Sequence, residues 1–109
     1  MSDIQEIISL LQNPTDKDTA LIRKAYDFAF KAHVGHLRKS GEPYFNHLFA
    51  TAKSIAELGI GATVIAAGLL HDAIEDVKAS PEEIEKEFGR EILFLVEGVT
   101  KLGKIRYHG

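Results

Sequence analysis

Residues 62–76 read ATVIAAGLLHDAIED, a nearly continuous apolar segment that ends with one imidazole and three carboxylates. The segment is too long for an ordinary strand, so we predict a buried helix over these residues. Residues four apart share one face of a helix, which places His71 over Glu75 and Asp72 over Asp76. Because burying an unpaired carboxylate is costly, this acidic cluster requires a cation or wide exposure to water.

The rest of the chain also has the spacing of helices. Apolar residues recur at intervals of three and four, and no segment alternates with the period of two that marks a strand. We therefore expect an all-α fold, a bundle of about six helices. The expected helices cover residues 4–12, 16–32, 44–58, 62–76, 81–88 and 90–99.

Proline, glycine and capping residues set the expected helix boundaries. Pro14 ends the first helix, and Thr15 with Asp18 resembles a capping box that starts the second. Pro43 fits the first position of the third helix, which Gly59 ends. The fifth helix has a capping box, an N-terminal proline and a terminating glycine, at Ser80, Glu83, Pro81 and Gly89.

Composition restricts the possible functions. At 109 residues the chain is expected to form one domain, and it has no cysteine for disulfides or thiolate metal sites. Its net charge of −3 argues against a general nucleic-acid or anionic-membrane surface. Since the N-terminus has no signal pattern and the longest apolar stretch is too short to span a bilayer, we expect a cytoplasmic protein with neither DNA nor membrane as partner.

The acidic helix end and one further histidine form a candidate metal site. His71 and Asp72 supply adjacent ligands, and His47, in the first turn of the third helix, can supply a third. Imidazole with carboxylate suits Mn²⁺, Fe²⁺, Zn²⁺ or Co²⁺ better than Ca²⁺, and without thiolates we favour Mn²⁺. The alternatives remain a His47 bonded to backbone and an acidic helix end that water solvates.

Other polar residues complete this hypothesis. Glu75 and Asp76 lie one turn beyond the ligands, where a carboxylate can orient or deprotonate an attacking water. Arg38 and Lys39 add positive charge in the loop before the third helix, although each alone is more typical of a solvated surface charge. We give structural or surface roles to the remaining histidines, and leave a second basic run open between phosphate binding and a solvated tail: His33, His36 and His108, and Lys101, Lys104 and Arg106.

Together these motifs have a familiar order. The chain reads RKSGEPYFNH at 38–47, HDAIED at 71–76, FG at 88–89 and VEGVTKLGK at 96–104. From about Ala25 to Tyr107 it closely resembles the N-terminal hydrolase domain of the RelA/SpoT homologue family, within the HD-domain phosphohydrolase superfamily. The resemblance implies an all-helical HD fold and a Mn²⁺-dependent removal of pyrophosphate from the 3′ position of the alarmones ppGpp and pppGpp, yielding GDP or GTP in the stringent response.

The resemblance also implies roles for individual residues. By position, the metal ligands are His47, His71 and Asp72. Glu75 and Asp76 handle the attacking water. The substrate's guanine side is contacted by Arg38 and Lys39, with Ser40 nearby.

One departure from the family affects the expected activity. The family has a further metal-binding Asp on a downstream helix, and this sequence ends at Gly109 before reaching it. We therefore expect residues 1–109 to form a single HD domain that is incomplete at its C-terminal end, with impaired hydrolysis and no synthetase activity. The alternative is a non-catalytic (p)ppGpp-binding or regulatory module, with homodimerisation through exposed apolar helix faces. A different HD phosphohydrolase is a weaker option, because the loop at 38–41 belongs to the alarmone branch.

Overall fold

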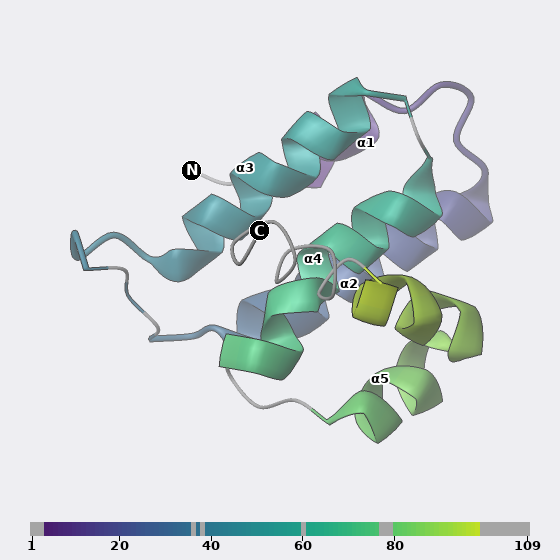
Figure 1. The fold of residues 1–109 in the computed structure, drawn as a ribbon. Helices are drawn as coiled ribbons and strands as arrows, with labels where there is room; N and C mark the ends of the chain where they lie inside the picture. Colours follow the sequence, from purple (N-terminus) through teal and green to yellow (C-terminus); the bar gives the residue numbers. More distant parts are fainter. Residues whose placement is uncertain (1–3, 36, 38, 60, 77–79, 99–109) are drawn as a thin grey trace, which may run out of the picture.

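The computed structural model describes residues 4–35, 37, 39–59, 61–76 and 80–98, and for residues 72–76 it describes the backbone alone. In this part of the chain every regular element is a helix, and the one β-type pairing is a single bridge between Leu37 and Pro43. The expectation of an all-α fold is therefore confirmed (Figure 1). The elements are α1 (Ile4–Ile8), α2 (Asp16–Ala32), α3 (Tyr44–Glu57), α4 (Ala62–Asp76) and α5 (Pro81–Phe88), followed by a helix at residues 90–98.

Helix α4 is the centre of the bundle. It covers the segment predicted from the sequence, and it packs against both α2 and α3. A helix that is apolar on all sides is stable only when neighbours cover it on more than one side, which is the position of α4. Its buried side chains are Ala62, Ile65, Ala66, Ala67, Leu69 and Leu70.

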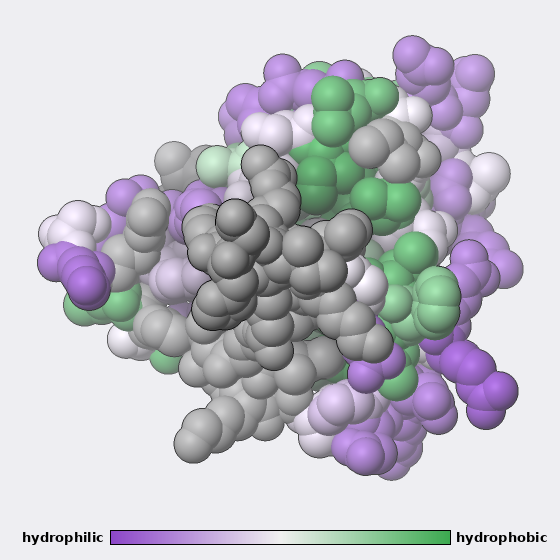
Figure 2. Space-filling model, in the orientation of Figure 1, coloured by the Kyte–Doolittle hydropathy of each residue, from purple (hydrophilic) through white to green (hydrophobic). Residues whose placement is uncertain are grey.

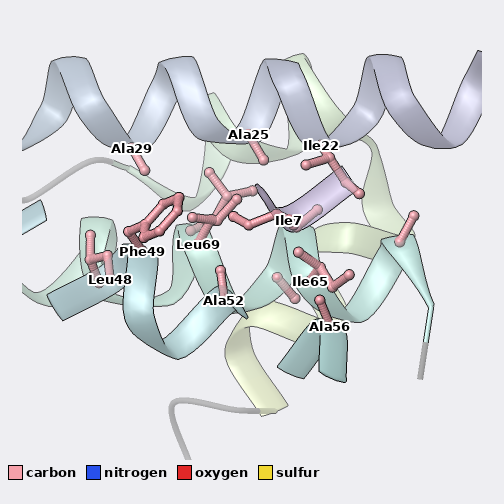
Figure 3. Close-up of a cluster of buried hydrophobic side chains, with 14 of the residues drawn as sticks. Ile7, Ile22, Ala25, Ala29, Leu48, Phe49, Ala52, Ala56, Ile65 and Leu69 are labelled. Atoms are coloured by element: carbon pink, nitrogen blue, oxygen red, sulfur yellow. The ribbon is translucent and has the colours of Figure 1, made fainter. Parts of the chain in front are cut away.

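Helix α2 begins at the predicted capping box. The Thr15 hydroxyl accepts the Asp18 N–H at 3.0 Å, and the Asp18 carboxylate accepts the Thr15 N–H at 3.1 Å. The buried face of α2 carries Ile22, Ala25 and Ala29, whose spacing of three and four keeps them on one side. Figure 3 shows these residues lying over Leu69 and the side chains of α3.

Helices α3 and α4 approach each other closely at Gly68. A Cβ atom added there would lie 2.7 Å from Cδ1 of Ile55 on α3, so the space that a side chain would take is filled by the neighbouring helix. The Ile55 side chain therefore packs directly against the α4 backbone, at the point where glycine leaves room for it. This contact lies one turn before His71.

Helix α5 has the expected start and stop. The Ser80 hydroxyl accepts the Glu83 N–H at 3.1 Å, and Pro81 occupies the first turn. Gly89 ends the helix with φ of 95°, a left-handed conformation that glycine adopts without the steric penalty of a Cβ.

One lysine connects α5 to α2. The Lys24 ammonium donates to the Glu87 carbonyl oxygen, lies 3.5 Å from the Glu87 carboxylate and sits 5.2 Å from the centre of the Phe88 ring. Phe28 meets the same Phe88 ring edge to face, with 5.5 Å between centroids. Both side chains of the ion pair are about half exposed, so the ion pair contributes little to the free energy of folding. The contact between the Phe28 and Phe88 rings contributes more to holding α5 against α2.

The predicted end of the first helix is wrong. It was expected at Gln12, but the helix ends at Ile8, because the next residues form tighter three-residue turns, with Leu10 N–H donating to the Ile7 carbonyl at 3.1 Å. The third helix begins at Tyr44, as predicted, but it is preceded by Pro43 as the N-cap, whereas Pro43 was expected at the first helical position. Its ψ of 130° is extended rather than helical, in keeping with its bridge to Leu37.

The helix at residues 90–98 contributes Ile92 and Val96 to the core, as predicted, with Leu95 partly buried against it. Val99, also expected in the core, lies outside the described residues.

Among the helices that the structure describes, none combines the length and the apolar character that crossing a membrane requires.

Some large apolar side chains remain on the surface. Figure 2 shows one face of the molecule, with hydrophilic residues around much of the rim and hydrophobic residues gathered in patches between them. Over the described residues the exposed large hydrophobic side chains are Phe30, Val34, Leu37, Leu58 and Phe94. Phe30, Val34 and Leu37 lie near the end of α2 and in the segment that follows it. They are close in sequence to Arg38, Lys39 and Ser40, which form the predicted nucleotide-binding loop.

Candidate metal-binding site

His71 lies near the end of α4, directly after the buried pair Leu69 and Leu70, and its side chain is half-buried. Its Nδ1 atom is 2.6 Å from the carbonyl oxygen of Gly68. A carbonyl oxygen can only accept, so Nδ1 carries the proton and donates. When His71 is neutral and Nδ1 carries the proton, the lone pair of the ring lies on Nε2, and histidines usually bind metals in this tautomer.

His47 lies in the first turn of α3 and its side chain is exposed. Its ring lies edge to face with the Tyr44 ring, with 5.7 Å between centroids and 71° between planes. The His47 carbonyl accepts the Thr51 hydroxyl at 3.1 Å, a bond that involves only its backbone. The alternative of a His47 side chain bonded to backbone therefore receives no support from the hydrogen bonds of its own turn.

The three carboxylates of the motif are placed by the backbone of α4. The helix continues through Asp76, so the backbone has the geometry in which Asp72 and Asp76 share one face and Glu75 follows His71 by one turn. The side chains of residues 72–76 lie outside the described part of the chain.

Among the side chains that the structure describes, no three from His, Asp and Glu come together in a group that could hold a metal ion. The predicted ligand set requires Asp72, which is outside that search. The ligand set of His47, His71 and Asp72 therefore remains a prediction.

The predicted nucleotide-binding loop is closed at its base by the bridge between Leu37 and Pro43. Lys39 and Ser40 are exposed between these two residues, and Gly41 turns the chain with φ of 90°. Arg38 lies outside the described residues.

Contacts within the loop connect it to α3. The Ser40 hydroxyl accepts the Glu42 N–H at 3.4 Å, and the Asn46 side-chain amide donates to the Glu42 carboxylate at 3.4 Å. Asn46 directly precedes His47. The loop and the candidate ligand are therefore held by the same turn of α3.

Two residues near His47 received no site role from the sequence. His33 is the C-cap of α2 and is only 3% exposed, and its Nδ1 donates to the Ala29 carbonyl at 2.9 Å. Its ring stacks on Tyr44, with 5.4 Å between centroids and 8° between planes. Helical spacing relates residues within one helix, so it cannot reveal a pair that lies on either side of a loop.

Other polar residues that the sequence analysis considered lie outside the described residues. They are His36, His108, Lys101, Lys104 and Arg106.

Comparison with known proteins identifies the family. A family model described as HD domain matches residues 25–108, most of the chain. This chain belongs to the HD domain family. The match begins within α2 and includes every residue of the predicted site.

Individual relatives agree with this assignment. The HD domain chain is 49% identical over 86 residues to a guanosine-3′,5′-bis(diphosphate) 3′-pyrophosphohydrolase of Aquifex aeolicus, covering 79% of this chain and 12% of that protein. It is also 49% identical over 89 residues to a GTP pyrophosphokinase of Myxococcus xanthus, covering 82% of this chain and 12% of that protein. A probable 3′-pyrophosphohydrolase of the same kind from Synechocystis is 47% identical over 96 residues, covering 88% of this chain and 13% of that protein.

The resemblance to the hydrolase domain of RelA/SpoT homologues is thus confirmed. The chain spans only about an eighth of the length of the curated relatives it matches, since they are covered to 12–13%.

Proposed function

We propose that this chain forms part of the active site of a metal-dependent alarmone hydrolase, which removes pyrophosphate from the 3′ position of ppGpp and pppGpp and yields GDP or GTP. The observation that carries the proposal is the state of His71: a half-buried imidazole at the end of the central helix, with Nδ1 bound to the Gly68 carbonyl. The relatives named as 3′-pyrophosphohydrolases support the choice of substrate.

The available donors fit a divalent transition metal. We propose that His47, His71 and Asp72 hold the ion, with Mn²⁺ preferred because imidazole and carboxylate are present and the chain has no cysteine. The Gly68 carbonyl orients the His71 ring, in the way that backbone acceptors commonly orient metal-binding histidines. When bound, the metal supplies a Lewis acid that polarises the phosphate and lowers the pKa of water.

The remaining residues of the motif have proposed roles in proton transfer and substrate binding. Glu75 and Asp76 accept a proton from the attacking water, since they follow the metal-binding pair by one helical turn. Arg38, Lys39 and Ser40 contact the guanine side of the substrate. The exposure of Lys39 and Ser40 leaves both side chains accessible to a nucleotide.

Metal binding by the 109-residue chain is the first test. Calorimetric titration with Mn²⁺ is expected to give one site, and His71→Ala is expected to abolish it. His108→Ala is the matched control, because it removes a histidine to which we assign no ligand role. Equal Mn²⁺ affinity in wild type and His71→Ala would refute the metal site.

The reaction itself is the second test. We expect slow, Mn²⁺-dependent release of pyrophosphate from ppGpp that is lost in Asp72→Asn. Metal-independent ppGpp binding that survives Asp72→Asn, with no hydrolysis by the wild-type protein, would instead identify a non-catalytic binding module.

A further inference from the structure

Three aromatic side chains form a continuous series from the core to the candidate ligand His47. The buried His33 ring stacks on the Tyr44 ring with 5.4 Å between centroids, and the Tyr44 and His47 rings lie edge to face with 5.7 Å between centroids. The first ring is also tied to α2, through the bond of 2.9 Å between its Nδ1 and the Ala29 carbonyl. The series therefore connects the end of α2 to the start of α3, across the loop that carries Lys39 and Ser40.

The burial of these rings decreases along the series. His33 is 3% exposed, Tyr44 is half-buried and His47 is exposed. In the part of the chain that the structure describes, His33 is the one buried polar side chain. Buried polar side chains need a specific reason, since a hydrocarbon of the same size would fill the space without the cost of desolvation.

An exposed histidine at the start of a helix would otherwise sample several rotamers. Tyr44 and His47 are three residues apart on α3, so their side chains meet on one face of its first turn. Tyr44 can restrict His47 only if its own ring is fixed, and the nearly parallel stack on the anchored His33 ring fixes it. A metal ligand that is already oriented binds its ion more tightly, because less rotational freedom is lost on binding.

We infer that His33 and Tyr44 are positioning residues that hold the His47 ring in the orientation required for metal binding. The inference rests on the proposed role of His47 as a ligand. Neither His33 nor Tyr44 contacts the metal in this scheme. Each acts through the next ring in the series.

The first test is on the metal-free 109-residue protein, by NMR of the histidine side chains. We expect nuclear Overhauser contacts between the Tyr44 and His47 rings, and slower ring motion for His47 than for an unrestrained side chain. Tyr44→Leu is expected to remove the ring-current shift of His47 and to raise its mobility. Tyr44→Phe keeps the ring and should preserve both. A His47 ring in wild type that is as mobile as it is in Tyr44→Leu would overturn the inference.

The second test is the affinity for Mn²⁺ alone. Loss of residues that orient a ligand typically weakens metal binding roughly 10- to 100-fold, and we expect this range for Tyr44→Leu and for His33→Leu. Tyr44→Phe should bind within a factor of about three of wild type, as an unchanged ring contact requires. Wild-type affinity in a folded Tyr44→Leu protein would also overturn the inference.

Phe28→Leu is the matched control. It removes one half-buried ring from another edge-to-face pair, in which Phe28 packs against Phe88 between α2 and α5. It should lower thermal stability like Tyr44→Leu and leave Mn²⁺ affinity and the His47 signals unchanged. If wild-type protein binds no Mn²⁺ at His47, the proposed function fails, and the NMR result on the metal-free protein still decides whether Tyr44 orders the ring.

Discussion

Alanine at position 68 gives a quantitative test of the contact between α3 and α4. A Cβ there would lie 2.7 Å from the Cδ1 atom of Ile55, closer than real Cβ atoms come to their neighbours. Alanine is favoured over glycine in a helix by about 1 kcal/mol, whereas overpacking costs about 1–3 kcal/mol. We therefore expect Gly68→Ala to lower the free energy of unfolding by about 0–2 kcal/mol, the difference between these two effects, with the value toward the lower end because Cδ1 is the far end of a flexible side chain that can shift.

Removing the obstructing methyl group should reverse the sign. In an Ile55→Val background Cδ1 is absent, so Gly68→Ala should stabilise the protein by about 1 kcal/mol through helix propensity alone. The two substitutions should therefore be coupled by about 1–3 kcal/mol in a double-mutant cycle, measured by urea unfolding followed by circular dichroism.

Gly98→Ala is the control, because among the described atoms nothing lies within 4 Å of a Cβ built there, and it should show no coupling to Ile55→Val. Coupling below about 0.5 kcal/mol between positions 68 and 55, the usual limit of additivity, would refute the close approach.

Three further predictions concern the rest of the bundle. Leu69→Ala should lower the free energy of unfolding by about 2–5 kcal/mol, because it opens a cavity at a side chain with 0% exposure, and urea unfolding measures this. Thr15→Ala should cost about 0.5–2 kcal/mol through loss of the capping box, with Ser as the conservative control that retains the hydroxyl. Lys24→Met, which keeps the apolar contact with Phe88 but not the charge, should cost less than about 1 kcal/mol, and a larger loss in thermal unfolding would show that the exposed ion pair dominates.

The helices of this protein could be predicted where a single strong local signal determines them. The α4 segment was predicted over its whole length because a nearly continuous apolar segment of 15 residues is longer than an ordinary strand. The Thr15 capping box was predicted because it involves only residues within one turn. The early end of α1 at Ile8 was missed, since a helix and a series of tight turns bury the same apolar residues.

The candidate site could also be predicted only where local sequence signals determine it. The sequence places His47 on α3 and His71 on α4, and the structure agrees, because each position follows from its own helix. The stack of His33 on Tyr44 depends on how α2 and α3 meet after the intervening loop, which no local pattern encodes. The carboxylate roles of the motif were inferred from helical spacing and from the family resemblance, and they remain predictions.

The central claim is that side chains from α3 and α4 hold one divalent ion. Anomalous diffraction at the manganese edge, from crystals of the protein grown with Mn²⁺, tests it most directly. We predict a single strong peak within bonding distance of a His47 ring nitrogen, His71 Nε2 and the Asp72 carboxylate. A protein with Mn²⁺ bound elsewhere, and with these three side chains not bonded to a common ion, would contradict the account.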